Sequence, residues 1–292
     1  MNPASTHHDV DRATVEVLAW VNEAHAAAYE LRGRCHGGAN SGAHLLTGPG
    51  GIPAVLKWTP DRTWARQVLR AVPVVRRIRE RGFPTPAWLF VGTTADGFPY
   101  QVQEFVEGDP LSILDDATAD LILDVVERQA GMNPDPGRNL SKIAAREAVA
   151  GARRARLRDS GEAGREVVET FDRLCRSVAD QKLPCEDMVH GDLGVENVLV
   201  RNGSIAGVID IEALGSGSRA FDLAKVLLHG YVWESEPCAL QRIHDHAEAI
   251  AGPGALRIFA AANTYTLLDH GLTHWPSIEP TVAPILQLAD EL

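Results

Sequence analysis

The chain of 292 residues contains 45% hydrophobic and 23% charged residues, which is close to the average of soluble globular proteins and excludes wholesale disorder or a fibre. This length is sufficient for a sizeable core and favours one large domain or two lobes around a cleft. The formal net charge of -11 argues against a nucleic-acid partner, because phosphate binding requires a basic surface, and it suits a cationic small molecule better.

The N-terminal part of the chain is predicted to be rich in strands. A helical pattern over residues 10–28 precedes two or three short strands within 29–58, which are separated by glycine-rich turns. The stretch 62–81 has helical spacing, but Pro73 lies in its middle and should kink or split the helix because proline lacks a backbone donor. Two further strands are expected over 88–106.

Helical patterns dominate the remainder, and one short strand pair around 198–211 interrupts them. The predicted helices cover residues 121–130, 141–157, 162–179, 240–250 and 254–268. We therefore predict an α+β architecture, with a small antiparallel-sheet lobe over 1–106 and a larger helical lobe over 107–292.

Three polar residues with fixed spacing lie at the predicted strand pair. Asp192 is in the loop before it, Asn197 follows five residues later, and Asp210 lies on the neighbouring strand. A loop between short strands can direct Asp192 at a substrate hydroxyl while the other two approach a metal ion. Oxygen ligands of this kind suit magnesium.

This combination resembles the aminoglycoside phosphotransferase family. The resemblance rests on His190-Gly191-Asp192, on Asn197 and on the Ile-Asp pair at 209–210, and it extends in order from the glycine-rich hairpin at 37–42 to Asp222-Leu223-Ala224. It implies an ATP-dependent phosphotransferase that acts on an alcohol group, with a protein-kinase-like fold of two lobes. The N-terminal lobe, 1–106, is then expected to bind the nucleotide, and the helical lobe, 107–292, to carry the catalytic residues and the substrate. ATP and Mg²⁺ are the implied cofactors.

The resemblance also implies a role for each matched residue. Asp192 is expected to orient and deprotonate the substrate hydroxyl, and Asn197 and Asp210 to bind the magnesium that bridges the phosphates. His190 braces the loop, since a lone histidine is more often packed than reactive. Asp222 is expected to hold the catalytic loop by accepting its backbone donors.

Lys57 is the predicted phosphate-binding lysine. It lies on a strand and follows the glycine-rich segment at the distance that a phosphate-covering hairpin requires, so Ser41 and Gly42 are expected to contact the nucleotide too. The helix after Lys57 normally supplies a glutamate partner, yet there is no Glu between Asp61 and Arg79. Three possibilities stay open: the helix is displaced, Glu80 swings in, or Lys57 is held by Asp210.

The segment 103–108 resembles the strand that receives adenine in such folds. The Glu104 carbonyl and the Val106 amide are the expected partners of the ring, with Ala54 and Ile209 above and below it. Two roles are considered equally for Glu212: it binds a second metal ion, or it is a solvated residue of the strand.

The acceptor is predicted to be a small molecule placed over Asp192. Eleven residues separate Asp210 from Asp222, which is too short a segment to form a platform for a peptide. Acidic side chains of the C-terminal region could bind its amines or could be solvated helix faces; they are Glu234, Glu236, Asp245 and Asp269. Among these, Glu234 and Asp269 are the residues we expect to contact the substrate.

The leading functional hypothesis is an antibiotic phosphotransferase acting on an aminoglycoside or on a basic cyclic peptide such as viomycin or capreomycin. The loop HGDLGVEN is similar to that of the viomycin-type enzymes. A metabolic kinase of choline, homoserine or a sugar is the alternative. A third hypothesis is an inactive ligand-binding protein, against which the intact Asp192, Asn197 and Asp210 argue.

Targeting and membrane signals are not found in the sequence. The first residues lack a basic segment followed by an apolar run, and no apolar stretch reaches the length needed to cross a bilayer. Four scattered cysteines show no spacing typical of a zinc site or a disulfide framework. We therefore expect a cytoplasmic protein with no membrane partner.

Overall fold

The computed structural model describes residues 3–35, 43–178, 181–233 and 235–292. The chain divides into two compact units, which we describe separately. The first unit comprises Met1–Asp109, Leu199–Arg201 and Ala206–Glu212, and the second comprises Pro110–Val198, Asn202–Ile205 and Ala213–Leu292.

An antiparallel sheet of five strands forms the centre of the first unit, in the order β1-β2-β3-β5-β4. The register of β3 and β5 places Ala54 opposite Glu104 and Lys57 opposite Gln101. The strands are β1 (Glu30–Arg34), β2 (Ala43–Thr47), β3 (Pro53–Trp58), β4 (Trp88–Thr93) and β5 (Pro99–Glu104).

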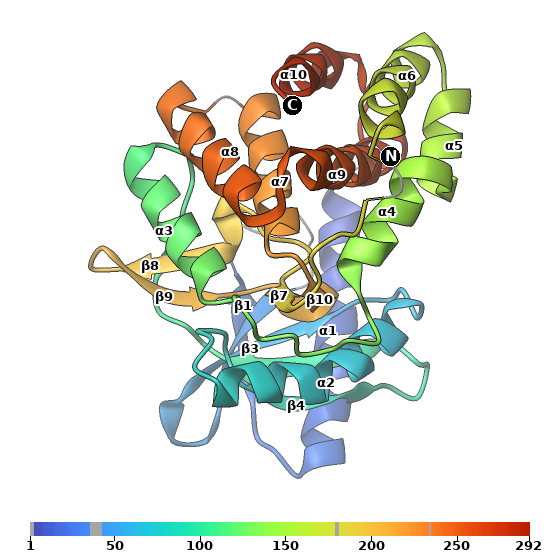
Figure 1. The fold of residues 1–292 in the computed structure, drawn as a ribbon. Coiled ribbons are helices and arrows are strands. Elements are labelled where there is room, and N and C mark those ends of the chain that lie inside the picture. Colours follow the sequence, from blue (N-terminus) through green and yellow to red (C-terminus); the bar gives the residue numbers. More distant parts are fainter. Residues whose placement is uncertain (1–2, 36–42, 179–180, 234) are drawn as a thin grey trace. The chain divides into compact units, whose positions relative to one another are not determined.

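Two helices pack against this sheet (Figure 1). Helix α1 (Pro3–His25) contributes Val17, Leu18 and Val21 to a core that includes residues of β2, β3 and β5. Helix α2 (Trp64–Glu80) lies against β4 and β5 and buries five apolar side chains at helical spacing. Pro73 does not split α2, because the packing of this apolar face on both sides of the proline offsets the missing hydrogen bond.

The second unit is mainly helical, and α9 runs through its middle (Figure 1). Helix α9 packs against five other helices and is buried along most of its length, which explains why its apolar residues are not confined to one face. The helices are α3 (Asp116–Glu127), α4 (Leu140–Ala150), α5 (Ala152–Asp159), α6 (Glu162–Arg176), α7 (Ala220–Val232), α8 (Pro237–Ala251), α9 (Pro253–His274) and α10 (Glu279–Asp290).

Short strands accompany the helices. Strand β7 (Asp187–Val189) pairs with β10 (Gly215–Gly217) in the second unit. A further sheet has the strand order β6-β8-β9. Its strands are β6 (Asp109–Pro110), β8 (Val198–Arg201) and β9 (Ser204–Val208).

The expected class, a small antiparallel sheet followed by a mainly helical region, is confirmed, but several boundaries were predicted wrongly. The predicted helix over 141–157 is two helices, because Gly151 has the extended angles φ -71° and ψ 155°. Helix α7 lies outside the helices predicted from the sequence because buried Asp222 interrupts its apolar pattern. Helix α10 was missed too, since it contains Pro284. Among the described helices, none is long and apolar enough to cross a membrane.

Candidate functional site

Lys57 projects from β3 toward two carboxylates of the first unit. Its Nζ donates to Asp210 Oδ1 and, at 3.1 Å, to Glu212 Oε1. Burial alone would lower the pKa of Lys57, but the charges of Glu212 and Asp210 outweigh this effect and raise it. Lys57 is therefore held as a cation at the end of β3.

Glu212 is the second partner that the sequence did not reveal for this lysine. Glu80 does not swing in, because it pairs with Arg76 at 3.1 Å on the surface of α2. The residue that α2 does contribute is Arg70, whose Nη2 donates to the backbone oxygen of Glu212 at 3.2 Å. Gln101 of β5 donates to Oε1 of the same glutamate. The acid that holds Lys57 thus comes from the segment after β9 instead of from the helix.

The backbone at Asp210 has an unusual conformation. Its φ angle of 59° lies in the left-handed region, which aspartate tolerates better than most residues but which still carries strain. The turn directs the carboxylate toward Lys57 directly after β9. Strained residues of this kind are concentrated at functional sites.

The predicted adenine contacts lie in the same unit as Lys57. Ala54 is buried and lies opposite Glu104, and a Cβ atom on Gly207 would come within 2.9 Å of Val106 Cγ1. Ile209 follows on the same segment. A pocket of about 290 Å³ adjoins this region and is lined by Arg79, Gly82, Phe83, Pro84, Thr85, Pro86, Glu104, Val106 and Ala206.

In the second unit, a buried carboxylate fixes the backbone of the Asp192 loop. Asp222 Oδ2 accepts the amide of His190 at 2.7 Å, and its Oδ1 accepts the amide of Gly191 at 2.9 Å. Gln129 adds a side-chain donor at 2.9 Å. Burial raises the pKa of Asp222, an effect that His190 and the backbone donors oppose.

Gly191 and His190 shape the loop before Asp192. Gly191 has φ 82°, and a Cβ atom there would lie 2.8 Å from the carbonyl oxygen of Ala213, so only glycine fits this close approach. His190 is fully buried, and its Nδ1 accepts the amide of Asp192 at 3.2 Å. This bond is the kind of bracing expected of a structural histidine.

Asp192 itself is half-exposed, with 54% of its side chain accessible. Asn197 donates Nδ2 to the backbone oxygen of Asp192 at 2.8 Å, which orients the amide of this buried residue. Lys225 of α7 contacts Asp192 Oδ1. Lys225 was not predicted from the sequence, although its position three residues after Asp222 places both on one face of a helix.

The donor chemistry of these residues fits magnesium. Asp210 and Asn197 offer a carboxylate and an amide oxygen, and magnesium binds proteins through one or two carboxylates together with substrate phosphates. Over the ranges that the structure describes, no cluster of three or more His, Cys, Asp or Glu side chains is gathered as it would be for a transition metal.

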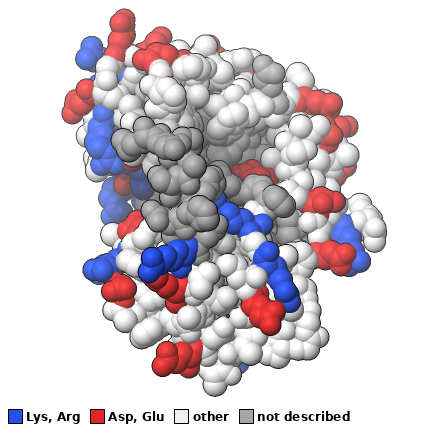
Figure 2. All heavy atoms as spheres, turned by 180° about the vertical axis from the view of Figure 1, so that it is seen from behind, with Lys and Arg blue, Asp and Glu red and all other residues white. Residues whose placement is uncertain are grey.

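The predicted substrate residues are less informative. Glu234 lies outside the described residues, as do Ser41 and Gly42, which were predicted to contact the nucleotide. Asp269 of α9 accepts two bonds from Arg156, at 2.8 and 2.7 Å, so its charge is already matched within the protein. Acidic and basic side chains are interspersed on the face shown in Figure 2 instead of being gathered by sign.

Known proteins resemble this chain over most of its length. The profile of the "Phosphotransferase enzyme family" matches residues 30–259. A search of curated proteins finds no match.

Three solved structures illustrate the shared fold. A thermostable mutant of the aminoglycoside phosphotransferase APH(4)-Ia, in a ternary complex with ADP and hygromycin B, has a TM-score of 0.68 at 15% identity and covers 93% of this chain and 97% of its own. The aminoglycoside-3'-phosphotransferase of type VIII has a TM-score of 0.58 at 23% identity, and the match covers 81% of this chain and 93% of that chain. The GDP complex of aminoglycoside 2'-phosphotransferase-IIIa has a TM-score of 0.61 at 15% identity, and the match covers 95% of this chain and 97% of that chain. At these identities the likeness establishes the protein-kinase-like fold, as predicted.

The position of Glu212 predicts an effect on nucleotide binding. Glu212→Gln removes the negative charge that faces Lys57 while keeping the shape of the side chain. A hydrogen bond between charged groups contributes roughly 1.5–3 kcal/mol. We expect nucleotide affinity, measured by calorimetry, to fall about tenfold or more. Glu80→Gln, which alters only an exposed pair on α2, is the control and should leave affinity unchanged. Equal affinities for the two variants would contradict this role of Glu212.

Proposed function

The chain belongs to the phosphotransferase enzyme family, and we propose that it transfers the γ-phosphate of ATP to a hydroxyl group of a small cationic antibiotic. The observation that carries this proposal is the fixed loop around Asp192. Asp222 and His190 hold its backbone, while the carboxylate of Asp192 stays half-exposed. Such a group can accept a proton from a bound alcohol.

In the proposed reaction the acceptor oxygen attacks the γ-phosphorus while its proton passes to Asp192. A new oxygen–phosphorus bond forms, the bond from the γ-phosphorus to the bridging oxygen breaks, and ADP leaves. Lys57, kept charged by its two acids, binds phosphate oxygens. Magnesium, bound by Asn197 and Asp210, would neutralise the charge of the phosphates.

ATP is supported as the donor by two similar structures, which are ternary complexes of APH(4)-Ia mutants with ADP or AMP-PNP and hygromycin B. Another similar structure is a GDP complex, so GTP is the informative competitor in an assay. Use of ATP also agrees with the cytoplasmic location that we propose from the sequence.

A cationic acceptor is supported by the net charge of -11 and by the hygromycin B bound in those similar structures. Within this class, the HGDLGVEN loop favours a basic cyclic peptide such as viomycin or capreomycin alongside the aminoglycosides. One observation favours the second candidate, a metabolic kinase of a neutral alcohol: Arg156 already neutralises Asp269, so an amine would have to compete with it.

The first test concerns the base. Asp192→Asn removes the proton acceptor but keeps the shape of the side chain, so kcat should fall roughly a hundred to ten thousand-fold while nucleotide still binds. Initial rates at saturating acceptor and a separate binding titration measure the two effects. The control is Asp124→Asn, which alters an exposed pair on α3. A loss below about tenfold would refute the role of Asp192.

The second test concerns magnesium. Asp210→Ala and Asn197→Ala should both raise the magnesium concentration needed for half-maximal activity, because each removes a hard oxygen donor. The aspartate variant should be the more severe, since it removes a charge. Activity is measured over a magnesium titration for both variants. An unchanged requirement in both would remove these residues from the metal site.

The third test concerns the acceptor. Viomycin, capreomycin and a set of aminoglycosides are offered with ATP and magnesium, and products are examined by mass spectrometry for one added phosphate. Affinity for a cationic acceptor should decrease as salt rises, because exposed charges are screened over about 8 Å at physiological salt. Efficient phosphorylation of homoserine, choline or a neutral sugar, with every cationic antibiotic inert, would favour the metabolic kinase instead.

A further inference from the structure

One side of α7 contacts the segment 187–192 at three successive points. These contacts are made by residues 219, 222 and 225, which are spaced by three from the N-cap into the second turn, so that successive members are neighbours on the helix surface. The residues that they contact follow one another in the chain, from Asp187 of β7 to Asp192. The contacts are Arg219 with Asp187, Asp222 with His190 and Gly191, and Lys225 with Asp192.

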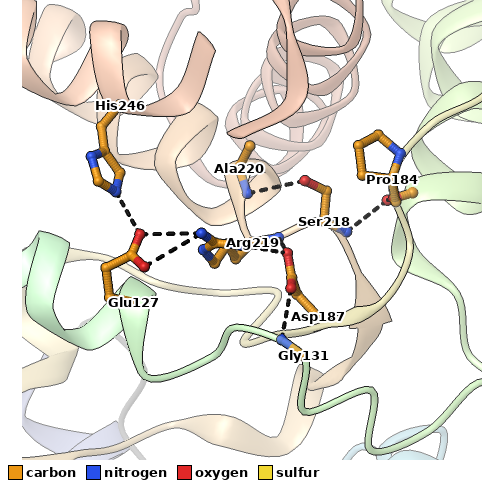
Figure 3. A network of polar contacts seen from close by, with 9 residues as sticks. Glu127, Gly131, Pro184, Asp187, Ser218, Arg219, Ala220 and His246 are labelled. Atoms are coloured by element: carbon orange, nitrogen blue, oxygen red, sulfur yellow. Dashed lines mark hydrogen bonds and ion pairs between the residues drawn. The ribbon is translucent and has the colours of Figure 1, made fainter. Parts of the chain in front are cut away.

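The first contact anchors the beginning of α7 (Figure 3). Arg219 donates its backbone amide and Nη1 to Asp187 Oδ2, at 3.2 and 3.1 Å. Asp187 Oδ1 accepts the amide of Gly131 at 2.9 Å, and Glu127 binds both Arg219 and His246. The start of the helix is therefore tied to β7 and to α3 and α8.

The third contact joins Lys225 to the predicted base. Nζ of Lys225 donates to Oδ1 of Asp192, and the lysine side chain is 15% exposed whereas that of the aspartate is 54% exposed. A largely buried ammonium group requires a partner, so this pair holds the carboxylate in one orientation. The loop between Asp192 and Asn197 contains no Lys or Arg of its own.

The next turn of α7 adds no competing charge. Burial, and then the charge of Lys225, lower the pKa of His229 to about 3, so this histidine is neutral at physiological pH. Its ring packs edge-on against Trp233 with the centroids 4.6 Å apart. Lys225 is thus the charged group that this part of α7 presents to Asp192.

We propose that Lys225 is a positioning residue of the phosphotransfer reaction: by binding Oδ1 of Asp192, it leaves Oδ2 directed at the acceptor hydroxyl. This inference rests on the proposed function. As the acceptor oxygen bonds to the γ-phosphorus and the bond to the bridging oxygen breaks, the hydroxyl proton passes to Oδ2. A carboxylate free to rotate would reach this arrangement less often, and a small misplacement of a reacting group can reduce the rate about a hundredfold.

The experiment compares Lys225→Met, Lys225→Arg and the control Lys142→Met in the full chain. Lys142 is an exposed lysine of α4 in the same unit. We expect Lys225→Met to lower kcat about 10- to 100-fold with little change in the acceptor KM, since the ground-state complex keeps its other contacts. Lys225→Arg should recover much of the loss because it restores the cation, and Lys142→Met should behave as wild type.

A double-mutant comparison separates positioning from a general structural effect. In the Asp192→Asn background, Lys225→Met should cause almost no further loss, because residues that act as a unit are not additive. Melting temperatures of all variants identify any loss of folding. If Lys225→Met does not fold, the rate of Lys225→Arg is compared with that of the wild type instead.

Either an unchanged kcat in Lys225→Met or additive losses in the double variant would overturn the proposal. Both outcomes differ from a failure of the proposed function, because in that case the Asp192→Asn variant itself would stay active.

Discussion

The loop around Asp192 depends on one interaction, the binding of its backbone amides by the buried carboxylate of Asp222. A charge with no access to solvent is tolerated only when donors surround it, and here two of the donors are backbone amides next to Asp192. The need to satisfy this charge therefore fixes the loop backbone and α7 together. Gly191 is constrained by the same geometry because its left-handed backbone closely approaches the Ala213 carbonyl. Lys225 reaches Asp192 as a consequence, one helical turn after the buried acid.

The first unit meets a comparable constraint with different residues. A mostly buried Lys57 needs an anionic partner, and α2, which carries no acid facing the lysine, does not supply one. Glu212 provides the charge, and Gln101 of β5 and Arg70 of α2 hold it in place. The helix thus still contributes to the site, but through an arginine bound to the backbone of the glutamate. Lys57 thus has anionic partners, but they lie after β9 and not on the helix that normally supplies one.

The sequence was most informative where the functional residues lie close together in the chain. The spacing of Asp192, Asn197 and Asp210 identified the family, and alternation identified the strand of Lys57. Contacts between distant residues could not be predicted in this way: Lys57 and Glu212 are 155 positions apart. The helix end at Gly151 and the burial of Asp222 in α7 could not be predicted from the helical pattern for a related reason. Tertiary contacts decide where those helices end and which side chains they bury.

Transfer of radioactive phosphate from γ-labelled ATP tests the central claim most directly, because it follows the group that Asp192 is proposed to help move. With the purified chain, magnesium and an accepted antibiotic, the label should appear in the acceptor at one phosphate per molecule. It should be nearly absent from the acceptor when Asp192→Asn replaces the wild type. Label found on the protein itself or only in inorganic phosphate, or undiminished transfer by the variant, would contradict direct transfer to a hydroxyl activated by Asp192.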